Sequence, residues 1–289
     1  MNAAVYIKRY PDIAARARAY ANYQWLAGLG SPLKLPALMP GGVSDTLVFE
    51  QLEGRHAQPP DLPMLADHLG HLHAMAYVRD LHRARLGQPY RTPADHELPS
   101  FLDRRQDAVA RELHTGTVRG ARLAADCAHL LIGQVDGPAA FYKDANPRNF
   151  LITPTGNTVM VDFDDLTLAP FGYDLAKLIV TLAMTHGPIL RQDIAAALSA
   201  YNTAAVSHCG SVPAVSWHEL MNWAEIHHIL TSRYAADGRY PYCWDAIRPS
   251  IRPRADRPWA LSPRSSSPAT AKPTAMSRGS WAACAAAPA

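Results

Sequence analysis

The 289-residue sequence predicts an α+β fold of two unequal lobes, a small lobe of strands and one helix followed by a larger, mainly helical lobe. Three observations lead to this prediction. A β-rich segment lies close to the N-terminus, amphipathic helical patterns dominate from Asp61 onward, and a compact β-rich segment interrupts them at 140–168. The larger lobe is therefore expected to carry an embedded β-hairpin.

The first 53 residues are predicted to form the small lobe and to end in a hinge. The segment AAVYIKRY at 3–10 has the composition of a short strand, and Pro11-Asp12 turns the chain into a helix over 13–27 that ends at a glycine. After proline- and glycine-rich turns, a β-rich run at 46–50 ends at Gly54. This second strand is expected to lead into the larger lobe.

Residues 54–251 are predicted to form the helical lobe. Five apolar residues recur at intervals of three or four, which indicates an amphipathic helix: Leu62, Leu65, Leu69, Leu72 and Met75. Further helices are expected at 98–113, 119–132, 172–185, 192–206 and 217–234.

The C-terminal segment 252–289 is predicted to be a disordered tail. Pro, Ser, Ala and Arg dominate it, and it offers too little apolar surface to offset the entropy of ordering. It holds six basic residues and one acidic residue, whereas the net charge of the whole chain is +3, so the body of the protein carries a charge of −2. A mildly acidic body predicts no nucleic-acid partner.

Several classes of protein are excluded by composition. The longest apolar runs, such as 175–184, are interrupted by Lys177 and Thr181 and are far shorter than a bilayer span. The N-terminus lacks the apolar core of a signal peptide, so we expect a cytoplasmic protein with no membrane partner. The 4 cysteines form no CxxC pair and the 13 histidines no HExxH pattern, which argues against a disulfide framework or a zinc site.

The most informative segment contains Asp144, Asn149 and Asp162. Asp144 and Asn149 belong to a D-x-x-x-x-N loop, and a predicted hairpin with strands at 150–152 and 159–161 returns Asp162 to the side of Asn149. Phosphoryl transfer requires such a group, because one carboxylate accepts the proton of the attacking hydroxyl while a carboxamide and a second carboxylate hold Mg²⁺.

At these residues the sequence resembles the aminoglycoside phosphotransferase/choline kinase family, within the protein-kinase-like fold. The catalytic loop of that family is usually written H-G-D-x-x-x-x-N and its metal motif D-F-D. Here they stand as Tyr142-Lys143-Asp144 with Asn149, and as Asp162-Phe163-Asp164. Tyr173-Asp174-Leu175-Ala176 matches a further family element downstream.

The resemblance implies a role for each of these residues. Asp144 would be the catalytic base, and Asn149 and Asp162 would be Mg²⁺ ligands with Asp164 as a possible third. Asp174 would be a buried structural acid that supports the catalytic loop. The implied phosphoryl donor is ATP.

Weaker matches lie on the nucleotide side. Val5-Tyr6-Ile7-Lys8 resembles the strand whose lysine pairs with the α- and β-phosphates of ATP, although a solvent-facing lysine on an edge strand is the alternative. The spacing to the second strand is that of a kinase hinge, where the backbone of Glu50 and Leu52 would hydrogen-bond adenine. Lys8, Glu50 and Leu52 are therefore the expected nucleotide-binding residues.

Three departures from the family pattern bear on activity. Only seven residues precede Lys8, too few for the two strands and Gly-rich loop that cover the triphosphate, so the small lobe is expected to be incomplete and truncated. The helix at 13–27 contains no glutamate to pair with Lys8. Tyr142 replaces the usual histidine and is expected to retain its packing. The candidates for a neutral partner of Lys8 are Tyr20, Asn22 and Gln24.

We therefore expect an ATP-dependent phosphotransferase that acts on the hydroxyl of an aminoglycoside-, choline- or sugar-like alcohol. The alternative is a catalytically impaired pseudokinase or truncated relative that binds a ligand or partner. A protein kinase is disfavoured because only ten residues separate Asp162 from Tyr173 and no A-P-E sequence follows. The acidic body suits a cationic acceptor, and the carboxylates expected to line its pocket are Asp165, Asp193, Glu219 and Glu225.

Overall fold

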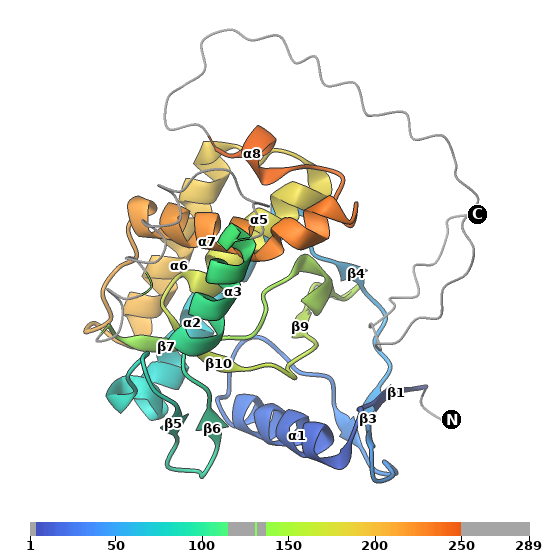
Figure 1. Cartoon of the computed structure of the whole chain (residues 1–289). Helices are drawn as coiled ribbons and strands as arrows, with labels where there is room; N and C mark the ends of the chain where they lie inside the picture. Colours follow the sequence, from blue (N-terminus) through green and yellow to red (C-terminus); the bar gives the residue numbers. More distant parts are fainter. Residues whose placement is uncertain (1–3, 115–130, 132–136, 250–289) are drawn as a thin grey trace, which may run out of the picture.

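The computed structural model describes residues 4–114, 131 and 137–249 of the chain (Figure 1). The tail at 252–289 lies outside the described residues, as does the helix expected at 119–132 except for Leu131. Within the described residues, no helix combines the length and the hydropathy needed to span a bilayer.

The small lobe has the predicted helix and the two predicted strands, and a third, short strand that was not predicted completes its antiparallel sheet. Strand β1 (Val5–Arg9) pairs with β3 (Thr46–Glu50), which also pairs with β2 (Leu38–Met39). Helix α1 (Ile13–Ala27) begins after Asp12, whose side chain accepts a hydrogen bond from the N–H of Ala15 at 2.7 Å. In Figure 1, α1 and this sheet lie at the bottom, below the helices of the larger lobe.

The larger lobe is mainly helical, and its helices follow the predicted pattern closely. They are α2 (Leu62–Arg79), α3 (Leu102–His114), α5 (Tyr173–His186), α6 (Arg191–His208), α7 (Trp217–Ala236) and α8 (Trp244–Ile247). Helix α5 lies at the centre of the lobe and is buried from Tyr173 to Met184, which explains its nearly continuous apolar sequence.

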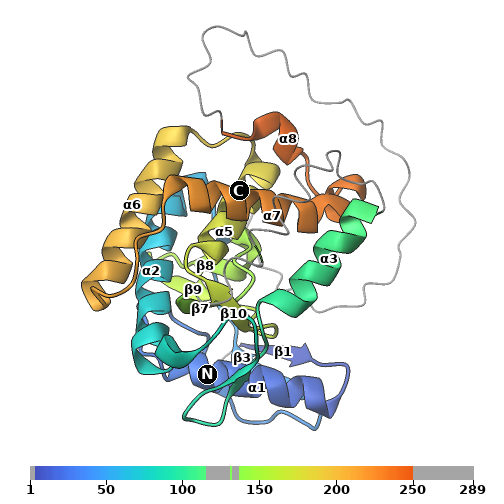
Figure 2. The same ribbon diagram turned by 60° about the vertical axis from the view of Figure 1, so that its left-hand side comes forward.

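Helices α2 and α6 pack side by side (Figure 2). Their close approach requires a glycine, because a Cβ atom added at Gly70 would lie 2.3 Å from the carbonyl oxygen of Tyr201. The predicted start of the next helix, at residue 98, is wrong by four residues. Leu98 instead belongs to β6 (Glu97–Leu98), which pairs with β5 (Tyr90–Arg91), so α3 begins only at Leu102.

The predicted hairpin is present and is extended on both sides. Strand β8 (Phe150–Ile152) pairs with β9 (Thr158–Met160), and β4 (Arg55–His56) from the linker pairs with β8. A separate antiparallel pair joins β7 (Ala139–Tyr142) to β10 (Thr167–Pro170). The segment between β9 and β10 therefore starts at the hairpin and returns to the strand that precedes Asp144.

The two lobes share one continuous core. The ring of Phe163 contacts Phe49 of β3 at 5.8 Å and Tyr23 of α1 at 5.4 Å between ring centroids. The small lobe also contacts the hairpin directly, because the backbone of Lys34 bonds to residues on both sides of Val159. These contacts hold the nucleotide-side strand β1 close to the segment that follows β9.

Candidate active site

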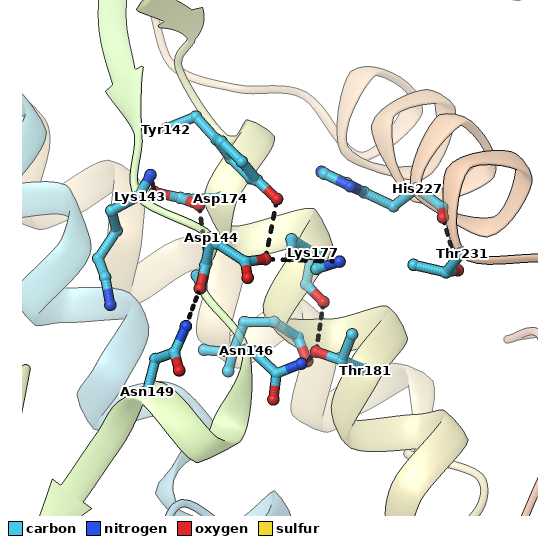
Figure 3. Close-up of polar contacts among 12 residues, drawn as sticks. Tyr142, Lys143, Asp144, Asn146, Asn149, Asp174, Lys177, Thr181, His227 and Thr231 are labelled. Atoms are coloured by element: carbon cyan, nitrogen blue, oxygen red, sulfur yellow. Dashed lines mark hydrogen bonds and ion pairs between the residues drawn. The ribbon is translucent and has the colours of Figure 1, made fainter. Parts of the chain in front are cut away.

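The D-x-x-x-x-N loop is closed by a side-chain hydrogen bond. Asn149 lies in a 3₁₀ turn at Pro147–Asn149, and its Nδ2 donates to the backbone carbonyl of Asp144 at 2.8 Å (Figure 3). This bond engages the amide nitrogen and directs Oδ1 of Asn149 away from the loop. The spacing of five residues thus brings the two side chains together, as the sequence predicts.

Asp144 has a φ angle of 61°, a left-handed conformation that is costly for residues other than glycine. Two hydrogen bonds from its neighbours offset this cost. The fully buried carboxylate of Asp174, in the first turn of α5, accepts the N–H of Lys143 at 2.9 Å and the N–H of Ala145 at 3.1 Å. Asp174 therefore clamps the residues on both sides of Asp144, the support that the resemblance implies.

Polar contacts lead from Gly172 through Tyr201 and His73 toward Asp174. The N–H of Gly172 donates to the hydroxyl of Tyr201 at 2.9 Å, and this hydroxyl lies 2.8 Å from Nδ1 of His73. The other ring nitrogen of His73, Nε2, lies 3.7 Å from the Asp174 carboxylate, beyond hydrogen-bond distance. No spacing in the sequence relates His73 to the catalytic loop, because the contact joins three separate helices.

Asp162 is delivered by the hairpin. The N–H of Val161 donates to the carbonyl of Asn149 at 2.9 Å, which fixes the residue before Asp162 against the catalytic loop. Asp162 also has a left-handed φ angle, 59°. The two left-handed aspartates of this segment are the proposed base and the proposed metal ligand, and such strained residues gather at active sites.

Lys8 of β1 pairs with the Asp162-Phe163-Asp164 segment. Its Nζ lies 2.9 Å from Oδ1 of Asp162 and 2.7 Å from Oδ2 of Asp164, and only 7% of its side chain is exposed. The alternative of a solvent-facing lysine is therefore wrong. Lys8 finds its carboxylate partners in the larger lobe, although α1 carries no glutamate.

The prediction that Tyr20, Asn22 or Gln24 would be a neutral partner of Lys8 is also wrong. Asn22 instead donates its Nδ2 to the carbonyl oxygens of Phe163 and Asp164, both at 2.8 Å, and Gln24 donates to the hydroxyl of Tyr20 at 2.8 Å. Asn22 thus ties α1 to the backbone of the segment that holds Lys8. Lys8 and α1 therefore each contact the Asp162-Phe163-Asp164 segment separately.

Burial and charge act in opposite directions in this cluster. Burial lowers the pKa of Lys8, but the nearby carboxylates of Asp162 and Asp164 outweigh it and raise that pKa above its ordinary value. Burial raises the pKa of Asp164, and the Lys8 ammonium opposes this rise. One ammonium faces two carboxylates, so the cluster retains a negative charge when both are ionised.

Tyr142 does more than preserve the packing expected of it. Its hydroxyl donates to Oδ1 of Asp144 at 2.9 Å (Figure 3). The centroid of its ring lies 5.4 Å from that of the Tyr173 ring. Burial, followed by the charge of Asp144, raises the pKa of Tyr142 well above its ordinary value. The phenol therefore stays protonated and remains a hydrogen-bond donor to the carboxylate. Lys177 of α5 approaches the same Oδ1 at 3.5 Å.

The expected hinge residues lie beside the hairpin. Leu52 packs against Leu151, Val159 and Val161, next to the strand that leads to Asp162. The N–H of Glu50 donates to the carbonyl of Ala37, and the Glu50 side chain accepts from the N–H of Ala37 at 2.7 Å. The backbone N–H and the side chain of Glu50 thus both form hydrogen bonds within the small lobe.

A pocket of about 230 Å³ opens beside Asp144. Residues from the catalytic loop, α5 and the end of α7 line it: Asp144, Asn146, Arg148, Lys177, Tyr234, Arg239 and Tyr240. None of the four carboxylates expected to bind an acceptor is among these lining residues. Two of them have other partners, since Glu225 pairs with Arg248 and Glu219 accepts the N–H of Ser216 at the start of α7.

Comparison with known proteins decides the family. The profile of the phosphotransferase enzyme family (APH) matches residues 5–208, which is more than half of the chain. The chain belongs to this phosphotransferase family. No curated protein sequence matches it. The resemblance based on Asp144, Asn149 and Asp162 is therefore confirmed at the level of the family.

Solved phosphotransferase structures share the fold. A choline/ethanolamine kinase family protein from Mesorhizobium loti has a TM-score of 0.53 at 15% identity over 82% of this chain and 79% of its own. The aminoglycoside phosphotransferase APH(3'')-Id from Streptomyces rimosus, in complex with ADP and streptomycin, has a TM-score of 0.52 at 16% identity over 78% of this chain and 86% of its own. The protein-kinase-like fold is thereby confirmed.

Lys143 occupies the position where the phosphotransferase family usually has glycine. Its side chain is 1% exposed, with Nζ 3.3 Å from the carbonyl of Val161 and 4.5 Å from the centroid of the Phe150 ring. Burial lowers the pKa of Lys143 to about 8, against the opposing charge of Asp174. The sequence alone gives no sign that Lys143, next to Asp144, is buried; its tertiary surroundings show it.

Proposed function

We propose that this protein is an ATP-dependent phosphotransferase that transfers the γ-phosphoryl group to a hydroxyl of a small aminoglycoside-, choline- or sugar-like alcohol. One observation carries the proposal: Asp174 holds Asp144 in a strained conformation at the mouth of a pocket, next to Asn149. Phosphoryl transfer depends mainly on such positioning and on electrostatic stabilisation.

Asp144 is the proposed general base. As the acceptor oxygen bonds to the γ-phosphorus, its proton passes to the Asp144 carboxylate. The bond from the γ-phosphorus to the β–γ bridging oxygen breaks, and ADP leaves with that electron pair. Tyr142 donates to Oδ1, so Oδ2 of Asp144 is the oxygen proposed to accept the acceptor's proton. Asp144 then releases this proton to solvent.

Asn149 and Asp162, with Asp164 as a possible third ligand, are the proposed Mg²⁺ ligands. Their donors are carboxylate and amide oxygens, the ligand type that Mg²⁺ prefers. In the described part of the chain, no group of three or more His, Cys, Asp or Glu side chains forms a metal site. This suits an ion that completes its shell with water and phosphate oxygens, and that neutralises phosphate charge when bound.

Lys8, Glu50 and Leu52 are the proposed contacts to the nucleotide. The ammonium of Lys8 is already held beside Asp162, so it is in place to pair with the α- and β-phosphates. Backbone groups of Glu50 and Leu52 would bond adenine at the edge of the hairpin.

A second candidate function is that of a pseudokinase that binds a ligand without transferring phosphate. The ion pairs of Lys8 favour it, because the ammonium engages both Asp162 and Asp164, two of the proposed metal ligands. ATP binding and turnover separate the two candidates.

The test is Mg²⁺-dependent ADP release by the full chain with a panel of hydroxyl acceptors. We expect turnover with at least one acceptor, and we expect Asp144→Asn to lose about 10²–10⁴-fold of the rate, the usual contribution of a general base. Asp107→Asn, at an exposed carboxylate of α3, is the matched control and should retain full activity. Calorimetry that detects Mg·ATP binding without turnover would favour the pseudokinase, and the absence of both would refute the nucleotide site.

A further inference from the structure

We propose that the acceptor carries an anionic group, a carboxylate or a phosphate, besides the hydroxyl that is phosphorylated. Arg148, Lys177 and Arg239 would bind this group in the pocket beside Asp144. The inference rests on the proposed function and narrows it, since it favours a sugar-like alcohol with an anionic group over the choline- and aminoglycoside-like cations.

The charge of the pocket lining carries the inference. Of the lining residues, three are cationic and one, Asp144, is acidic, so the lining has a formal charge of +2. The body of the protein has a charge of −2, so the pocket departs from the general charge of the molecule. A cationic acceptor would meet three like charges there, each of which opposes its binding.

Lys177 is the most buried of the three cations. Its side chain is 11% exposed, and Asp144 is the only carboxylate within 4 Å of its ammonium among the described residues. That contact is long, at 3.5 Å, and Oδ1 of Asp144 already accepts the hydroxyl of Tyr142 at 2.9 Å. A nearly buried ammonium with a single long ion pair gains from a further anion, because desolvation of a charge is costly unless it is paired.

The two arginines flank the other side of the pocket. The guanidinium of Arg239 lies 5.0 Å from the centroid of the Tyr234 ring, and its backbone N–H donates to the Tyr234 carbonyl at 3.1 Å. Arg148 belongs to the 3₁₀ turn of the catalytic loop. No carboxylate in the described part of the chain lies within 4 Å of either guanidinium, so both are available to a bidentate anion.

The γ-phosphate of ATP is the other anion that such a pocket could bind. The lining residues argue against binding of the γ-phosphate, because all of them belong to the larger lobe. They do not include Lys8, Asp162 or Asp164. The pocket lining is therefore separate from the residues proposed to hold the nucleotide phosphates and the metal ion. Its volume of about 230 Å³ suits a small hydroxy acid or a phosphorylated polyol.

The test compares acceptors that share a hydroxyl but differ in charge. Full-length protein is assayed with Mg·ATP and glycerate, glycerol 3-phosphate, glycerol or choline. We expect turnover with an anionic acceptor, and we expect Arg239→Gln to raise the KM for that acceptor about tenfold or more while the KM for ATP stays unchanged. Arg18→Gln, at an exposed arginine of α1, is the matched control and should change neither constant.

Two outcomes would overturn the inference. One is a preference for choline or glycerol that Arg239→Gln leaves unchanged or improves. The other is a rise in the KM for ATP in place of the acceptor KM, which would assign the cations to the γ-phosphate.

A binding experiment separates this inference from the proposed function. Saturation-transfer NMR of the full chain without nucleotide should detect glycerate or glycerol 3-phosphate at millimolar concentration. The signal should weaken in Arg239→Gln and in Lys177→Met. Anion binding without ATP turnover would refute the phosphotransferase and keep the anion pocket. The absence of anion binding to the wild type would refute the pocket, whatever the turnover.

Discussion

Replacement of Lys143 by methionine is expected to stabilise the protein at neutral pH. Burial lowers the pKa of Lys143 to about 8 from an ordinary value of 10.5. The difference corresponds to about 3 kcal/mol by which the folded state disfavours the ammonium. Methionine has a similar volume and no charge, but it loses the contact of Nζ with the Val161 carbonyl, which costs about 1 kcal/mol. The expected net gain at pH 7 is about 2 kcal/mol.

The stability gained by Lys143→Met is expected to depend on pH. Below pH 8 the lysine is protonated in both the folded and unfolded states, so its full penalty is present. Between about pH 8 and 10.5 the unfolded chain holds a proton that the folded protein has released, and the free energy of unfolding rises with pH. The advantage of Lys143→Met should therefore shrink across this window.

The assay is denaturant unfolding followed by tryptophan fluorescence at a series of pH values from 7 upward. Lys34→Met, at an exposed lysine of the small lobe, is the matched control and should leave the free energy of unfolding nearly unchanged at every pH. A Lys143→Met variant less stable than wild type at pH 7, or an advantage that stays constant with pH, would refute the reasoning.

Two further predictions concern the proposed base, Asp144, and the core. Tyr142→Phe removes the hydrogen bond to Asp144 but keeps the ring, so kcat should fall about fivefold to tenfold; a kcat equal to that of the wild type would contradict this. Gly70→Ala should destabilise the protein by about 1–3 kcal/mol in thermal unfolding, because the added methyl group meets the Tyr201 carbonyl. Gly210→Ala, with open space around its Cβ position, is the control. Equal stability of the two variants would contradict the close contact between α2 and α6.

The catalytic loop and hairpin could be predicted because their signals are local. Five positions separate Asp144 from Asn149, a span that a single turn closes with one hydrogen bond. The strands after Asn149 and before Asp162 pair through a short turn, so two short apolar runs and the turn residues between them suffice to place them. The predicted helix start at Leu98 was wrong because Leu98 pairs with Tyr90 of β5, in a two-residue strand pair too short to show a strand pattern in the sequence.

The partners of Lys8 could not be predicted, because 154 positions separate it from Asp162. The sequence shows the absence of a glutamate in α1 but not the carboxylates that replace it. The hydroxyl of Tyr142 on Asp144 was missed for a different reason. A tyrosine in place of histidine predicts only that an aromatic ring packs at this position. The hydrogen bond depends on the left-handed conformation of Asp144, whose neighbour Lys143 is bonded to Asp174.

The sequence by itself determined the family and the fold class, since the motifs that indicate them lie within about forty residues of one another. Only the tertiary structure decided what surrounds Asp144. Lys177, Arg148 and Arg239 come from three elements separated in the chain, and they form a cationic pocket because α5 and the end of α7 pack beside the catalytic loop. The charge of a pocket is the sum of the charges of residues that are neighbours in space, and the sequence alone does not show which residues these are.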